Sequence, residues 1–175
     1  MTWSKTKMTT IQKNDYHLFL KHIPGEAKSL SSDLLLQGIE EYCRLTGETE
    51  LRVSRTPEGR PVFSRRPDLD LSLTHAKNLF ALAVGRGKIG VDAELWEEDR
   101  PRIRERYFLE EEKNEPFSMI WTGKEAVGKL TGSGLSDALR CHVFKDGATL
   151  DGKTYALFRH RAGEYLITVA REAEE

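Results

Sequence analysis

The stretch Gly90-Val91-Asp92-Ala93-Glu94 places two carboxylates two residues apart in an apolar segment of strand-forming character. On a β-strand, residues i and i+2 point to the same face, with Cα atoms roughly 6–7 Å apart. Two such carboxylates, completed by substrate phosphate and water, are a usual way of holding Mg²⁺. The alternative is a solvent-facing polar edge of a half-buried strand, and this motif alone leaves both interpretations open.

A second set of reactive side chains lies in the segment WTGKEAVGK. On a helix, Glu125 lies one turn from both Trp121 and Lys129, so these three residues share one face. A carboxylate there can complete a metal site or accept a proton, and Lys129 can offset the charge of a phosphate. The alternative is an ordinary Glu–Lys pair beside a buried Trp. Gly128 costs a helix about 1 kcal/mol relative to alanine, which indicates close packing or a ligand.

Two shorter motifs supply groups that suit phosphate binding. In SLTH, Ser72 and Thr74 share one side of a strand. Leu73 between them is expected to face the core, and His75 follows where the strand ends. In GRP, Arg60 carries a planar guanidinium that matches phosphate oxygens. The ordinary alternatives are an exposed histidine and a solvated arginine in a hairpin turn.

The hydrophobic pattern predicts the elements that carry these groups. A helix is expected between Ser31 and Gly47, and others over residues 101–108 and 117–130. Strands are expected over residues 16–23, 51–54, 60–64, 69–73, 80–84, 89–94, 140–144, 154–159 and 165–170. The first ten to thirteen residues are expected to fray. The order strand, helix and strands occurs twice, which indicates an α+β fold of two α/β halves.

Composition limits the class of protein. The 175 residues are 38% hydrophobic and 31% charged, which is typical of one globular domain or two small fused halves. The net charge of −1 argues against a nucleic-acid partner. Residues 1–86 carry +3 and residues 87–175 carry −4, so an anion site in the first half and a cation site in the second are permitted.

The apolar runs, the first ten residues and the cysteines predict a cytoplasmic protein with no membrane partner. The longest strongly apolar run, residues 79–84, is far shorter than the ~20 residues of a membrane-spanning helix. The first ten residues are polar and do not resemble a secretory signal. The two cysteines, Cys43 and Cys141, form no CxxC motif, so a disulfide scaffold is not expected.

Taken in order, GRP, SLTH, GVDAE and WTGKEAVGK resemble the motif set of the 4′-phosphopantetheinyl transferases. The family patterns are G-[KR]-P, S-x-[ST]-H, [GI]-[VI]-D-x-E and W-x-x-K-E-[AS]-x-x-K. The segment GSGLS also resembles the stretch that follows the family's long helix. The resemblance runs from about Gly59 to Ala138 and is greatest to the two-half, surfactin-synthetase-activating type. It implies two similar halves, residues 1–86 and 87–175, in a pseudo-twofold arrangement and one compact unit.

The resemblance implies an enzyme that moves the phosphopantetheine arm of coenzyme A to a serine of an apo acyl or peptidyl carrier protein, releasing 3′,5′-ADP. This is holo-acyl-carrier-protein synthase activity, and it serves fatty-acid, polyketide or nonribosomal peptide biosynthesis. It implies a monomer that uses Mg²⁺, with Mn²⁺ as a possible substitute. The implied metal ligands are Asp92, Glu94 and Glu125, and the implied catalytic groups are Glu125, Lys129 and Asp92. The implied coenzyme A contacts are Arg60, Ser72, His75 and Lys129.

Glu125 would also be the base that deprotonates the serine, directly or through water. Carrier proteins are acidic around their serine, so Arg102, Arg104 and Arg106 are candidate carrier contacts. Their spacing does not give one face of a helix, and a solvated helix is the alternative.

Two other functions compete with this one. A non-catalytic relative would bind coenzyme A or a carrier protein with little turnover. A metal-dependent nuclease would also use Asp, Glu and Lys, but that class places an acidic residue and a lysine close together on one strand. Here Glu94 is followed by Leu95-Trp96, and the lysines lie on the predicted helix.

Overall fold

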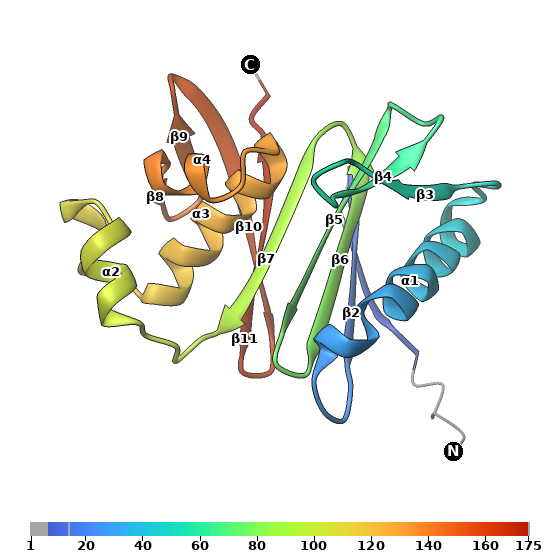
Figure 1. Cartoon of the computed structure of the whole chain (residues 1–175), viewed down its shortest axis with the longest axis horizontal. Helices are drawn as coiled ribbons and strands as arrows, with labels where there is room; N and C mark the ends of the chain where they lie inside the picture. Colours follow the sequence, from blue (N-terminus) through green and yellow to red (C-terminus); the bar gives the residue numbers. More distant parts are fainter. Residues whose placement is uncertain (1–6, 14, 175) are drawn as a thin grey trace.

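Two antiparallel sheets pack face to face in the computed structural model, and each carries a helix on its outer face (Figure 1). The structure describes residues 7–13 and 15–174. The elements in chain order are β1 (Thr9–Gln12), β2 (Tyr16–His22), η1 (Ala27–Leu30), α1 (Ser31–Thr46), β3 (Arg52–Arg55), β4 (Pro61–Ser64), β5 (Leu69–Ala76), β6 (Leu79–Arg86), β7 (Ile89–Leu95), α2 (Pro101–Tyr107), η2 (Glu110–Glu112), α3 (Phe117–Thr131), α4 (Leu135–Arg140), β8 (His142–Phe144), β9 (Gly147–Leu150), β10 (Lys153–Ala162) and β11 (Tyr165–Glu172).

The first sheet has the strand order β1-β2-β6-β5, with α1 against its outer face. Leu35 and Ile39 of α1 are buried against Phe80 and Leu82 of β6, as their spacing of four residues predicts. The helix ends at Gly47, which adopts the left-handed conformation at φ 76°. β3 and β4 form a separate hairpin beside this sheet.

The second sheet has the order β7-β11-β10-β9-β8, with α3 on its outer face. Ile120 and Val127 of α3 are fully buried in this second core. A third cluster fills the space between the sheets, where Leu18 and Ala81 of the first sheet meet Val91 of the second. The chain is therefore layered as helix, sheet, sheet and helix (Figure 1).

The two sheets meet where the edge strands β5 and β7 run alongside each other (Figure 1). β7 pairs with β11 on one side only, so its other edge carries backbone N–H groups that need partners. Side chains of β5 provide them. The Val91 N–H donates to Ser72 Oγ at 3.0 Å, and the Ile89 N–H donates to Asp70 Oδ2 at 3.1 Å.

Both faces of β5 are covered. Leu73 packs against the first core, as its place in the alternation predicts, although it is only half-buried. Ser72 and Thr74 on the other face are buried, because the second sheet covers that face. The hydroxyls are tolerated there since both take part in hydrogen bonds.

Besides the short 3-10 helices η1 and η2, three elements were not expected from the pattern. Residues 9–12 form β1, which pairs with β2, so the prediction of fraying is wrong for them. That prediction also covers residues 1–6, which lie outside the described residues. The short helix α4 and the strand β9 occupy segments with no clear hydrophobic period.

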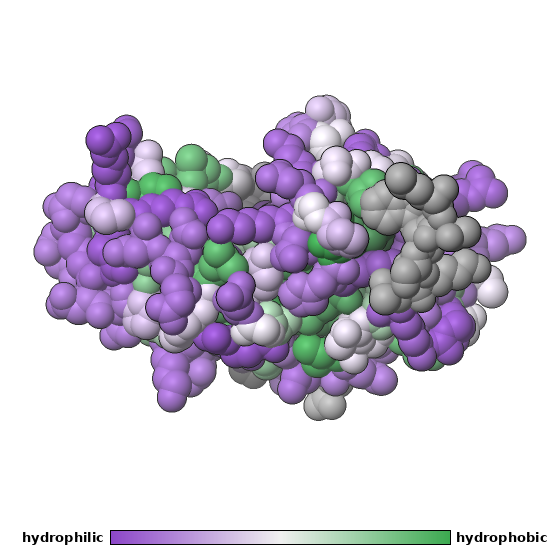
Figure 2. Space-filling model, turned by 90° about the horizontal axis from the view of Figure 1, so that it is seen from below, coloured by the Kyte–Doolittle hydropathy of each residue, from purple (hydrophilic) through white to green (hydrophobic). Residues whose placement is uncertain are grey.

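The surface is mostly hydrophilic. The face seen in Figure 2 shows hydrophobic side chains as separate small patches rather than one broad area. Among residues 7–13 and 15–174, no helix is both long enough and apolar enough to cross a membrane.

Candidate functional site

Asp92 lies in the middle of β7 and points toward α3. It is 7% exposed, and its Oδ1 accepts hydrogen bonds from Lys129 Nζ at 2.9 Å and from Thr74 Oγ1 at 3.1 Å. Lys129 Nζ also donates to the Val91 carbonyl at 3.0 Å. Lys129 belongs to α3, which packs on the second sheet, and Thr74 belongs to the first sheet. Together they hold the buried carboxylate of Asp92 in a single orientation.

The helix α3 approaches β7 closely enough for these contacts because Gly90 has no side chain, and Gly128 allows a second close approach on the other side of the helix. A β-carbon at Gly90 would collide with the backbone carbonyl of Ala126. A β-carbon at Gly128 would collide with the backbone of Gly134, in the loop that follows the helix. The close packing expected at Gly128 is therefore present. Gly128 also lines the cleft described below.

Glu125 lies one turn before Lys129 on α3. Burial raises the pKa of the Glu125 carboxyl, and the charge of Asp92 raises it further, while the charges of Lys129 and Arg100 lower it. Asp92 and Glu125 are therefore close enough to repel each other. The shared helix face expected for Glu125 and Lys129 brings both residues to the same carboxylate on β7.

Glu94, two residues after Asp92, experiences the same repulsion. Burial, followed by the charge of Asp92, raises the pKa of Glu94 to about 7. Arg100 opposes this shift, because its Nη2 lies 3.1 Å and 2.9 Å from the two carboxylate oxygens of Glu94. Arg100 Nε also donates to Glu98 at 3.1 Å. No sequence motif indicates Arg100, which lies in the loop before α2.

The expected metal ligands Asp92, Glu94 and Glu125 suit a hard divalent cation in their chemistry. All three offer carboxylate oxygens, and their mutual repulsion would be relieved by a cation. Within the described part of the chain, however, no group of three or more His, Cys, Asp or Glu side chains is arranged ready to hold a metal ion. Glu94 is held by Arg100 instead, so the three-carboxylate metal set stays a prediction.

A cleft of about 470 Å³ lies between α3 and the first sheet, and its size suits a small-molecule ligand. Its lining includes Arg60, Ser72, His75 and Lys129, which are the four residues expected to contact coenzyme A. Its lining runs from Ser31 to Gly134, so segments far apart in the sequence, including β4, β5 and α3, meet in its wall. The cleft thus brings the phosphate-binding candidates together, beside the carboxylate of Asp92.

Two of these cleft residues also hold the protein together. Arg60 Nη2 lies 2.6 Å from Asp70 Oδ2, and its Nη1 donates to the Lys129 carbonyl at 2.7 Å. The Ser72 hydroxyl accepts the Val91 N–H. His75 is exposed on the cleft wall. Arg60 therefore connects the β3–β4 hairpin, β5 and the end of α3, a role that the GRP motif does not reveal.

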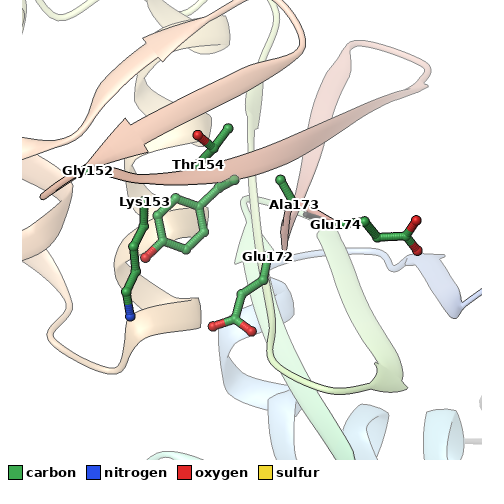
Figure 3. Close-up of a pocket in the computed structure, with 7 residues that line it drawn as sticks. Gly152, Lys153, Thr154, Glu172, Ala173 and Glu174 are labelled. Carbon is green, nitrogen blue, oxygen red and sulfur yellow. The ribbon is translucent and has the colours of Figure 1, made fainter.

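Two other hollows differ from this cleft in most of their lining residues. One of about 490 Å³ lies beside the cleft and shares Glu58, Arg60 and Gly132 with it. Another, lined by residues 152–155 and 172–174, lies at the outer end of the β10–β11 pair (Figure 3). It shares no residue with the cleft, and none of its residues belongs to the motifs described above.

The three arginines of α2 that are candidate carrier contacts differ in their exposure and in their partners. Arg102 and Arg106 are exposed. Arg104 instead binds within the protein, donating to the carbonyls of Lys113 and Glu115 at 2.8 and 2.7 Å. Of these three arginines, Arg102 and Arg106 are therefore placed to meet a partner.

Sequence reasoning missed three residues of the site. Thr74 orients Asp92, Asp70 binds Arg60, and Arg100 binds Glu94. The alternation of β5 placed Thr74 on the same side as Ser72, which was the one available signal. The partners of Asp70 and Arg100 depend on how the sheets pack.

The part of the chain that carries this site is similar to known proteins. Residues 88–171 match the family model of the 4'-phosphopantetheinyl transferase superfamily. The chain is 25% identical over 140 residues to the 4'-phosphopantetheinyl transferase ffp of Bacillus subtilis, and 23% identical over 140 residues to Sfp of Bacillus subtilis strain 168. Each match covers 72% of this chain and 62% of the relative, so the chain matches less than two thirds of these curated relatives.

The matched residues include β7, α3 and β11, which carry or support Asp92, Glu94, Glu125 and Lys129. The family indicated by the motifs is thereby confirmed, while its surfactin-synthetase-activating type has weaker support. By its motifs and these matches, the chain is similar to the 4'-phosphopantetheinyl transferase superfamily, whose family model its residues 88–171 match.

Proposed function

We propose that this protein transfers the 4′-phosphopantetheine group of coenzyme A to a serine of an apo acyl or peptidyl carrier protein. The position of Lys129 carries this proposal. It lines the cleft with Arg60, Ser72 and His75, and it binds Asp92 at 2.9 Å. A phosphate bound in the cleft would therefore lie against the carboxylates of β7 and α3.

The reaction is a phosphoryl-type transfer. The serine oxygen forms a bond to the β-phosphorus of coenzyme A, and the bond from that phosphorus to the 3′,5′-ADP leaving group breaks. Glu125 accepts the serine proton, and its raised pKa makes it a stronger base than an ordinary carboxylate. Lys129 offsets the negative charge that develops on the leaving group.

Asp92, Glu94 and Glu125 would hold the Mg²⁺ or Mn²⁺ ion. When bound, a divalent ion neutralises charge on the diphosphate. The protein's own contribution is to fix Asp92 through Thr74 and Lys129. Glu125 lies near enough to Asp92 for the charge of Asp92 to raise the pKa of Glu125.

Several finer features belong to the same proposal. We expect the surfactin-synthetase-activating type of enzyme, which is a cytoplasmic monomer with two similar halves in a pseudo-twofold arrangement. Its partner would be a carrier protein of fatty-acid, polyketide or nonribosomal peptide biosynthesis. The layered arrangement of two sheets with outer helices supports the two-half interpretation.

The test is intact-protein mass spectrometry of an apo carrier protein incubated with this protein, coenzyme A and Mg²⁺. We expect the carrier to gain one phosphopantetheine group, and 3′,5′-ADP to appear in equal amount. Chelator and the Glu125→Gln variant should abolish the gain. A matched control is Glu111→Gln, which removes an exposed carboxylate outside the cleft.

The alternative is a relative that binds coenzyme A or a carrier protein without turnover. Coenzyme A binding by calorimetry, with no mass gain on fatty-acid, polyketide and peptide carriers, would favour that alternative. Absence of coenzyme A binding would contradict both.

A further inference from the structure

The contact between Arg100 and Glu94 is unusual for a carboxylate expected to bind a metal ion. One guanidinium nitrogen of Arg100, Nη2, donates to both oxygens of Glu94, at 3.1 and 2.9 Å. The Glu94 side chain is only 15% exposed. A cation of the protein itself therefore occupies the oxygens through which Glu94 would hold a divalent ion.

The charges around this contact make the competition strong. Asp92, Glu94 and Glu125 bring three formal negative charges, while Lys129 and Arg100 bring two positive ones. Lys129 pairs with Asp92, and Arg100 pairs with Glu94. Removing Arg100 would leave Glu94 without its partner, and repulsion among the carboxylates would then favour any cation that enters.

Arg100 keeps other contacts when a metal ion binds Glu94 in its stead. Its Nε donates to Glu98 at 3.1 Å, and its guanidinium lies 5.7 Å from the centre of the Phe117 ring. The Arg100 side chain is 39% exposed, so its Nη2 can turn to water while the contact with Glu98 remains. Release from Glu94 therefore requires no unfolding of the loop between β7 and α2.

We propose that Arg100 is a resident counter-ion of the carboxylate site, which a divalent cation must displace from Glu94. This inference rests on the proposed function, because it takes Asp92, Glu94 and Glu125 as the metal ligands. Its consequence is that the protein alone binds a divalent ion weakly, since each binding event must break the Arg100–Glu94 pair.

The experiment is a titration of the full chain with Mn²⁺, followed by the electron paramagnetic resonance signal of free Mn²⁺ and without any carrier protein. Arg100→Gln should bind Mn²⁺ about tenfold more tightly or better than the unsubstituted protein, because a competing charge is gone. Arg102→Gln, an equal loss of charge at an exposed position two residues away, should change the affinity less than twofold. Circular dichroism would establish that each variant is folded.

A second pair of variants tests whether Glu98 is the partner of Arg100 after Arg100 leaves Glu94. Glu98→Gln should weaken Mn²⁺ binding, because Arg100 loses its alternative partner and stays on Glu94. In the Arg100→Gln background, the same Glu98 substitution should have a clearly smaller effect. An equal effect in both backgrounds would show that Glu98 acts only through its charge and would contradict the exchange between the two glutamates.

Failure of this inference is distinguishable from failure of the proposed function. If Asp92→Asn abolishes Mn²⁺ binding but Arg100→Gln leaves it unchanged or weaker, the counter-ion role is overturned and the metal site stands. If Asp92→Asn and Glu125→Gln both bind Mn²⁺ as the unsubstituted protein does, the metal assignment itself is wrong, and the inference is overturned with it.

Discussion

The hydroxyl of Thr74 on β5 donates a hydrogen bond to Oδ1 of Asp92 on β7, across the junction between the two sheets. The bond is 3.1 Å long, and both side chains are buried. The residue that the motifs identify as a metal ligand is thus held partly by the other sheet. The geometry of the candidate site therefore depends on how the two sheets dock.

Replacing Thr74 with valine should impair this site while preserving the shape of the side chain. A hydrogen bond to a charged group contributes about 1.5–3 kcal/mol. We expect Thr74→Val to lower kcat/KM for phosphopantetheine transfer roughly tenfold, and the free energy of unfolding by about 1–2 kcal/mol. Steady-state kinetics and urea unfolding would measure the two effects. Thr74→Ser, which keeps the hydroxyl, should behave nearly as the unsubstituted protein does, and an unimpaired Thr74→Val would contradict the role.

Arg60 and Asp70 should be energetically coupled. Their charged atoms lie 2.6 Å apart, and both side chains are partly buried. In a double-mutant cycle of Arg60→Gln and Asp70→Asn, we expect a coupling energy of about 0.5–3 kcal/mol in urea unfolding. Additive effects would instead indicate that Arg60 serves the ligand alone, as the motif implies. The affinity of Asp70→Asn for coenzyme A, measured by calorimetry, would then show whether the contact with Asp70 also positions Arg60 for binding.

The pair formed by Glu112 and Lys124 should be the most sensitive ionic contact in the second core. Lys124 Nζ lies 2.8 Å from Glu112 Oε2, and both side chains are at most 1% exposed. Lys124→Met leaves a buried carboxylate without its partner, so we expect a loss of about 3–5 kcal/mol in the free energy of unfolding.

The double variant Glu112→Gln and Lys124→Met should recover part of this loss. A glutamine carries no charge, yet its amide oxygen can still accept the Val143 N–H that Glu112 binds at 2.7 Å. As a control, Lys113→Met removes a lysine whose partners Glu105 and Glu110 are largely exposed, so its effect should stay below about 1 kcal/mol. A double variant no more stable than Lys124→Met would refute this explanation.

Acid should weaken the protein through His160. Its Nε2 lies 2.8 Å from the Tyr16 hydroxyl, and burial, with a smaller contribution from Lys13, lowers the pKa of His160. Below its ordinary pKa of about 6.5, the unfolded chain takes up a proton more readily than the folded protein does. Stability is therefore complete above that pH and falls as the pH drops toward the lowered pKa.

His160→Gln removes this titration and keeps a group that can bind the Tyr16 hydroxyl. The free energy of unfolding, measured at pH 7.5 and 5.5, should fall less for this variant than for the unsubstituted protein. The change that remains in both proteins combines His17, whose lowered pKa acts in the same direction as that of His160, with Glu94 and Glu125, whose raised pKa values act in the opposite direction. Equal losses in the two proteins would exclude His160 as the source.

Elements with strong local patterns were predictable from sequence. The spacing of Leu35 and Ile39 predicted α1 with its stop at Gly47, and the turn around Gly59 predicted the β3–β4 hairpin. By contrast, α4 has only six residues, and β9 is formed by small residues in Gly147–Leu150. Such short segments owe their structure to the neighbours they pair with rather than to their own periodicity.

By itself, the sequence determined the local directions of the candidate site residues. The i, i+2 spacing placed Asp92 and Glu94 on one face of a strand, and the i, i+4 spacing placed Glu125 and Lys129 on one face of a helix. Only the tertiary structure decided their partners: Lys129 and Thr74 bind Asp92, and Arg100 binds Glu94. The physical reason is that backbone periodicity sets the direction of a side chain locally, whereas contacts between distant segments depend on the packing of whole sheets and helices.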